Sequence, residues 1–132
     1  MRLLDEKISN IIDTAHFRYV QFDGNIIRVY NRTANEFTSN PRAYYVEFDS
    51  EDAAKEKFDE ISKEAGWFQF LQNGKTILLN TFCFSRFYIG NRKNTDGDIS
   101  YSIIFFNSEN DSISIRCKSY EKALESLKGL VG

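Results

Sequence analysis

The chain has 132 residues, enough for one domain with a sizeable core, and we expect a single domain over 1–132. Aromatic residues make up 15% of it, with 12 Phe and 7 Tyr, which excludes a disordered chain. The formal net charge of −2 excludes a global attraction to nucleic acids or anionic membranes. The charge is uneven, however, because residues 1–66 carry 9 Lys/Arg against 13 Asp/Glu, whereas residues 67–132 carry 8 against 6.

Residues 3–12 at the start of the chain admit two interpretations. Leu4, Ile8, Ile11 and Ile12 have the spacing of an amphipathic helix. The stretch KTILL at 75–79, which aligns with this segment, follows Asn73-Gly74 and is typical of a strand. We therefore favour a strand from about Asn10, preceded by a short helical turn.

Strands are predicted wherever aromatic and β-branched residues gather or alternate with polar ones. The predicted strands are 16–22, 26–30, 43–48, 85–90, 99–106 and 112–117. Turn residues at 23–25, 73–74 and 96–98 separate them. The aromatic stretch WFQFL at 67–71 has no predicted pairing partner and adds to the apolar surface.

Two helices are predicted, from about Glu51 to Ala65 and from about Tyr120 to Leu130. Ser50 and Ser119 are suited to cap their first turns, because a serine side chain accepts a hydrogen bond from an exposed backbone N–H there. The acidic residues of the first helix fall on its solvated face.

The two halves of the chain align with each other. IIDTAHF at 11–17 matches LLNTFCF at 78–84 with an offset of 67, and the caps and apolar positions of the helices match with an offset of 69. We therefore expect sub-repeats 1–66 and 67–132, each of several antiparallel strands followed by one helix, related by a pseudo-twofold axis. The fold class expected is α+β, with helices packed on one face of antiparallel sheet.

This order of elements resembles that of the PUR repeat and of Whirly and PC4-like single-strand-binding proteins. The resemblance covers nearly the whole chain, but it concerns the order of elements and no sequence motif. It implies single-stranded nucleic acid as a ligand and assigns no site residue.

Catalytic and cofactor chemistry receive little support from the sequence. The single His16 and the thiols of Cys83 and Cys117 are best interpreted as structural residues, with His16 and Cys83 partly buried and Cys117 in the core. One His and two distant Cys do not make a zinc site, and no phosphate-binding glycine motif is present. We expect no enzyme, no metal and no cofactor. The two cysteines and the absence of a signal sequence favour the cytoplasm.

Binding is the function that the sequence favours. The leading hypothesis is a protein–protein module, a homodimer or a complex with another protein, because strand alternation leaves aromatic residues on both sheet faces. The alternative is single-stranded nucleic acid, because FSRFYIGNRK at 84–93 interleaves basic and aromatic residues; an enzyme of unknown class ranks third. The predicted binding residues are Arg18, Tyr19, Tyr45, Trp67, Arg86, Tyr88, Arg92 and Lys93.

Overall fold

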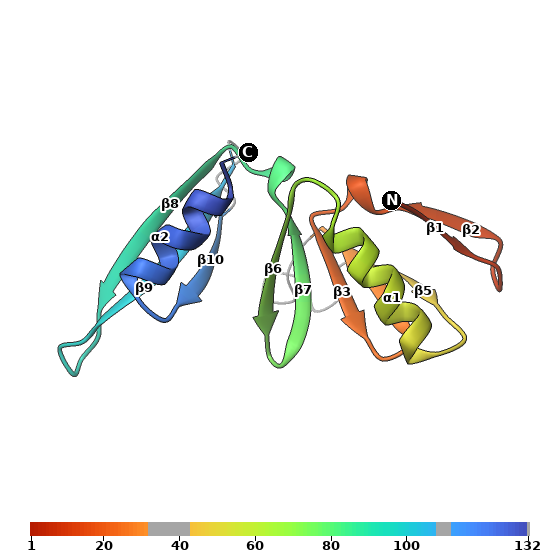
Figure 1. Cartoon of the computed structure of the whole chain (residues 1–132), viewed down its shortest axis with the longest axis horizontal. Helices are drawn as coiled ribbons and strands as arrows, with labels where there is room; N and C mark the ends of the chain where they lie inside the picture. The colour runs from red at the N-terminus through yellow and green to blue at the C-terminus, as the bar shows by residue number, and fades with distance from the viewer. Residues whose placement is uncertain (32–42, 108–111, 132) are drawn as a thin grey trace. The chain divides into compact units, whose positions relative to one another are not determined.

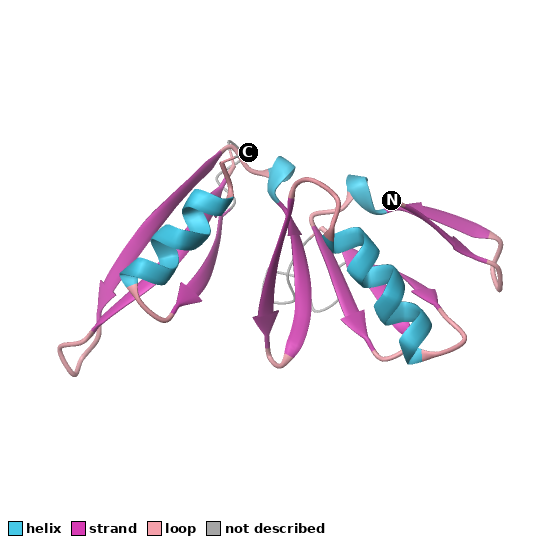
Figure 2. Cartoon of the chain, viewed as in Figure 1, coloured by secondary structure: helices cyan, strands magenta, loops and turns pink. Residues whose placement is uncertain are grey.

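The computed structural model describes residues 1–31, 43–107 and 112–131. The chain divides into two compact units, Met1–Thr81 and Phe82–Gly132. Each unit combines antiparallel strands with one longer helix, as Figures 1 and 2 show. The predicted α+β class with antiparallel sheet is therefore confirmed.

The first unit contains a hairpin and a five-stranded antiparallel sheet. Strands β1 (Arg2–Asp5) and β2 (Asn10–Asp13) form the hairpin. The larger sheet has the order β5 (Ala43–Glu47), β4 (Ile26–Tyr30), β3 (Tyr19–Asp23), β7 (Lys75–Asn80) and β6 (Trp67–Gln72). A short 3-10 helix, η1 (Thr14–His16), connects β2 to β3.

Helix α1 (Glu51–Ser62) covers one face of this sheet because its apolar residues share one side. Ala54, Phe58 and Ile61 are buried there, and the Phe58 ring lies 5.8 Å from that of Phe22 on β3. The core around them also contains Leu3, Ile12, Val20, Ile27, Val29, Val46 and Leu78. Ser50 caps the helix as predicted, with its hydroxyl accepting the N–H of Ala53 at 3.1 Å.

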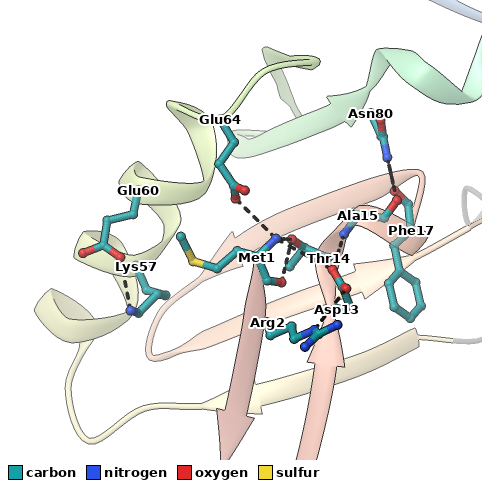
Figure 3. Close-up of polar contacts among 10 residues, drawn as sticks. All are labelled: Met1, Arg2, Asp13, Thr14, Ala15, Phe17, Lys57, Glu60, Glu64 and Asn80. Atoms are coloured by element: carbon teal, nitrogen blue, oxygen red, sulfur yellow. Dashed lines mark hydrogen bonds and ion pairs between the residues drawn. The ribbon is translucent and has the colours of Figure 1, made fainter.

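The start of the chain is tied to η1 by polar contacts (Figure 3). The N-terminal ammonium donates to Thr14 Oγ1 at 2.9 Å, and the N–H of Ala15 donates to Asp13 Oδ1 at 3.1 Å. The latter hydrogen bond is the main cause that lowers the pKa of the Asp13 carboxyl. The Asn80 side chain, which is buried, donates to the carbonyls of Ala15 and Phe17 at 3.1 Å each. These contacts hold the hairpin and η1 beside the end of β7.

The second unit is a three-stranded antiparallel sheet with one helix. Its strands, in spatial order, are β10 (Ser112–Cys117), β9 (Ile99–Phe106) and β8 (Arg86–Lys93), and η2 (Thr81–Cys83) lies where the two units join along the chain. Helix α2 (Tyr120–Gly129) packs on the sheet and buries Ala123. The Phe105 ring forms the centre of this core. Its centroid lies 5.9 Å from that of Phe84 and 5.5 Å from that of Phe87.

Most predicted elements lie where the sequence places them, and the differences have local causes. The strands 26–30, 99–106 and 112–117 are confirmed, whereas the strand predicted at 16–22 begins only at Tyr19 because η1 precedes it. The strand predicted from about Asn10 is confirmed as β2, but strand β1 and the hairpin turn precede it in place of the short helical turn predicted there. The interpretation of WFQFL as unpaired is also wrong, since β6 pairs with β7 through a turn with positive φ at Asn73 and Gly74.

The kinds of elements follow the same order in both halves of the chain. A two-stranded hairpin, a 3-10 helix, three further strands and an α-helix run from β1 to α1 and again from β6 to α2. The hairpin β6–β7 belongs to the sheet of the first unit, where β7 pairs with β3.

Candidate functional site

The face of the β8–β10 sheet turned away from α2 has a composition of its own. Strand residues alternate between faces, and Phe87 points to the α2 side, where it meets Phe105. Its neighbours Arg86 and Tyr88 therefore lie on the other face, and cross-strand partners share that face with them. This outer face consists of Arg86, Tyr88, Gly90, Arg92, Ser100, Ser102, Ile104, Phe106, Ser112, Ser114 and Arg116.

The centre of the outer face is a depression of about 330 Å³ whose lining residues include Gly90, Arg92, Ser102 and Arg116. Gly90 leaves room there for Ile104, because a Cβ atom at this position would lie 2.5 Å from the Ile104 Cδ1 atom. The floor of the depression is therefore apolar, and serine hydroxyls and guanidinium groups surround it.

Hydrogen bonds order one side of this depression. The Arg116 guanidinium donates from Nη2 to Ser100 Oγ at 3.2 Å, and Asn94 Nδ2 donates to the same oxygen at 2.8 Å. The remaining N–H donors of Arg116 stay available to a ligand, because a guanidinium carries five.

Arginine and tyrosine meet on β8. The Arg86 guanidinium lies over the Tyr88 ring, 4.6 Å from its centroid, which is a cation–π contact. Arg86 and Arg92 are exposed, whereas the Tyr88 side chain is half-buried.

The outer face is positively charged because it contains arginines and no carboxylates. The sequences of the three strands, RFYIGNRK, ISYSIIFF and SISIRC, include no Asp or Glu. Among the described residues, Arg86, Arg92 and Arg116 form no ion pair. Their charge is therefore available for an anionic ligand.

The structure brings three of the predicted binding residues together. Arg86, Tyr88 and Arg92 alternate along β8 and share the outer face. Lys93 is exposed but belongs to the α2 side of the strand, because it follows Arg92 directly.

The other four predicted residues belong to the first unit and do not form a comparable group. Tyr19 is 2% exposed and stacks on Tyr30 with ring centroids 5.0 Å apart, and Trp67 packs partly buried against the α1 core. Tyr45 is 54% exposed on β5. Arg18 lies just before β3, where its backbone N–H donates to Asn31 Oδ1 at 2.9 Å.

The sequence-based prediction missed Arg116 and the serines of β9 and β10. The alternation in SISIRC places Arg116 opposite the apolar Ile113, Ile115 and Cys117, so a signal was present. Its pairing across β9 with β8 depends on register, which a single sequence does not reveal.

The residues considered for catalysis are not gathered into a site. His16 is exposed, contrary to the partly buried position expected. Cys83 is half-buried as expected, and Cys117, expected in the core, is also only half-buried. In the described ranges, no three His, Cys, Asp or Glu side chains lie close enough to hold a metal ion. Within the same ranges, no helix has the length and apolar character needed to cross a membrane.

Comparisons of the chain with protein-family models, with curated proteins and with solved structures found no match.

Proposed function

We propose that the protein binds single-stranded nucleic acid on the outer face of the β8–β10 sheet. The observation that carries this proposal is the grouping of Arg86, Arg92 and Arg116 with the Tyr88 ring on a sheet face without carboxylates. Proteins that bind single strands combine positive charge along the backbone path with aromatic rings on which bases stack. Both features are present on this face.

The length of the face suits an extended chain of nucleotides. Arg92 lies six positions after Arg86 on β8, which corresponds to about 20 Å at the rise of a β-strand. In this proposal, Arg86, Arg92 and Arg116 contact phosphates and the serine hydroxyls contact phosphate or sugar oxygens. Tyr88, with Arg86 beside it, stacks on a base.

A single strand fits this surface better than a duplex. The bases of a duplex are stacked on each other and are read through its grooves by an inserted helix or ribbon. A tyrosine ring on a sheet surface can stack only on bases that are not already stacked on their neighbours, as in a single strand. The negative charge of the whole chain also limits non-specific attraction to duplex DNA.

The proposal includes a hypothesis on the fold, namely that the chain is a tandem repeat of two similar halves related by a pseudo-twofold axis. The recurring order of elements and the offset of 67 between β3 and β8 support it. At this offset Arg86 and Tyr88 correspond to Tyr19 and Gln21, and at the offset of the helices Arg116 corresponds to Glu47. Thus these basic residues occur only in the second half of the repeat, and this half is the one proposed to bind the ligand.

Binding to a protein is the second candidate function. Leu4, Ile8 and Ile11 of the β1–β2 segment are 56%, 64% and 64% exposed, a concentration of apolar surface on one short hairpin. In both proposals the protein acts by binding and not by catalysis, and a chain with only two cysteines suits the reducing cytoplasm.

A titration of labelled oligo-dT followed by fluorescence anisotropy tests the nucleic-acid proposal, with a duplex of the same length as control. We expect binding of the single strand that weakens as salt is raised, and much weaker binding of the duplex. Absence of single-strand binding at low salt would overturn the proposal.

A further inference from the structure

The depression on the outer face has an arginine on each side of its middle strand. Arg92 on β8 is the Cα partner of Ser100, and Arg116 on β10 is the Cα partner of Ser102. Both serines belong to β9, so the two arginines flank this strand from opposite sides, and both line the depression. All four residues belong to the unit Phe82–Gly132. A ligand in the depression therefore meets two positive charges.

Ser100 presents a hydrogen-bond donor to the same depression. Its oxygen accepts two hydrogen bonds, from Arg116 Nη2 at 3.2 Å and from Asn94 Nδ2 at 2.8 Å. Because a serine oxygen has two acceptor lone pairs, both are occupied and the hydroxyl hydrogen is left to donate to a ligand. Guanidinium groups also only donate hydrogen bonds. This combination favours a ligand whose atoms accept hydrogen bonds and carry negative charge, as phosphate oxygens do.

The basic surface of β8 ends at the depression. The turn that connects β8 to β9 follows directly and contains Asp96 and Asp98, both exposed. Asn94, which also lines the depression, begins this turn, and its backbone N–H donates to the carbonyl of Asp98 at 2.7 Å. A chain of phosphates that continued past Arg92 would approach these two carboxylates and be repelled by them. The charges therefore favour a strand that ends in the depression.

The end of a strand can carry a phosphate unlike those inside it. A terminal phosphomonoester has a charge of about −1.5 to −2 at pH 7 and three strongly accepting oxygens. An internal phosphodiester has a single negative charge and fewer free oxygens. Two guanidinium groups and a serine hydroxyl match the monoester better, because each of its charges and oxygens finds a partner.

We propose that the depression binds the terminal phosphate of a single strand, with Arg92 and Arg116 on the phosphate and Ser100 donating to one of its oxygens. The inference rests on the proposed function, in which the rest of the strand follows β8 toward Arg86. Tyr88 lies four positions before Arg92, about 13 Å along the strand, so its ring stacks on a base near the bound end.

Fluorescence anisotropy with three oligo-dT strands of equal length, each labelled on an internal base, tests the inference. One strand carries a 5′-phosphate, one carries a 3′-phosphate, and one has hydroxyls at both ends. We expect one phosphorylated strand to bind at least about tenfold more tightly than the hydroxyl-ended strand. Equal affinities for all three strands would overturn the inference and leave the proposed function standing. No binding of any strand at low salt would overturn both.

Two single variants that each remove one charge locate the bound phosphate. Arg116→Ala removes a guanidinium that lines the depression, so the ratio of the phosphorylated to the hydroxyl-ended affinity should fall to near one. Arg86→Ala is the matched control at the other end of β8, and it should weaken both strands while keeping this ratio. Both side chains are exposed, so neither substitution should unfold the protein.

Ser100→Ala separates the hydroxyl from the charge. It should also lower the affinity ratio, because it removes the proposed donor and the oxygen that holds Arg116, without a change in net charge. If the ratio falls as far in Arg86→Ala as in Arg116→Ala, the terminal phosphate does not bind in the depression and the inference is wrong.

Discussion

The guanidinium of Arg86 lies 4.6 Å from the centroid of the Tyr88 ring, and both side chains belong to the outer face of β8. Two residues apart on one strand, they share a face, so the contact follows from local geometry. Such a pair presents a positive charge beside an aromatic surface, which suits a ligand that alternates phosphates with bases.

Tyr88 is expected to contribute by stacking rather than through its hydroxyl. Tyr88→Ala should weaken oligo-dT binding by about 1–3 kcal/mol, the typical effect of removing one stacked ring. Tyr88→Phe, which keeps the ring, is the control and should bind nearly as tightly as the wild type. Equal losses in both variants, measured by anisotropy, would contradict stacking.

Each of the two capping serines should stabilise the unit that contains its helix. The Ser119 hydroxyl accepts the N–H of Lys122 at 3.2 Å, as Ser50 does for Ala53. Ser50→Ala and Ser119→Ala should each lower the free energy of unfolding by about 1 kcal/mol, and Ser→Asp should largely preserve it. Urea denaturation followed by circular dichroism measures this, and an unchanged transition in both alanine variants would show that the caps do not stabilise the helices.

Tyr30 should make stability depend on pH in the alkaline range. Burial raises the pKa of Tyr30 to about 12, and the nearby Arg28 opposes this shift only in part. Below pH 10 the residue is neutral in both folded and unfolded chains and adds no pH dependence. Between about pH 10 and 12 the unfolded chain loses this proton first, because an ordinary tyrosine has a pKa near 10, so stability falls as pH rises.

The comparison of wild type with Tyr30→Phe isolates this contribution. The variant should lose less stability between pH 10 and 12 in urea titrations, and its absorbance should lack one tyrosinate transition near pH 12. The same slope of stability against pH in both proteins would contradict the burial of the Tyr30 hydroxyl.

Local patterns explain why much of the fold was predictable. The alternation in SISIRC predicts strand β10, and Ser50 before an apolar helical stripe predicts the start of α1. Both predictions depend on neighbouring residues only, and tertiary contacts did not override them. The hairpin at residues 2–13 was harder, because Leu4, Ile8 and Ile11 have helical spacing and only pairing with a partner strand decides against a helix.

The site was predictable only in part for the same reason. Arg86, Tyr88 and Arg92 lie on one strand, and alternation alone places them together. Arg116 joins them through the register of β9 with β8 and β10, which is a long-range property. Tyr19 carried the same aromatic signal as Tyr88, but it is buried against Tyr30 because of the fold around it.

The salt dependence of oligo-dT binding, compared between two double variants of equal charge, tests the central claim most directly. Arg86→Ala/Arg92→Ala removes two charges from the outer face, and Lys93→Ala/Lys122→Ala removes two from the α2 side. If the outer face binds phosphates, the first variant should bind more weakly and lower the slope of log K against log salt by about 1.4, at about 0.7 per phosphate contact. The second should keep nearly the wild-type slope; equal slopes in the two variants would contradict binding on the outer face.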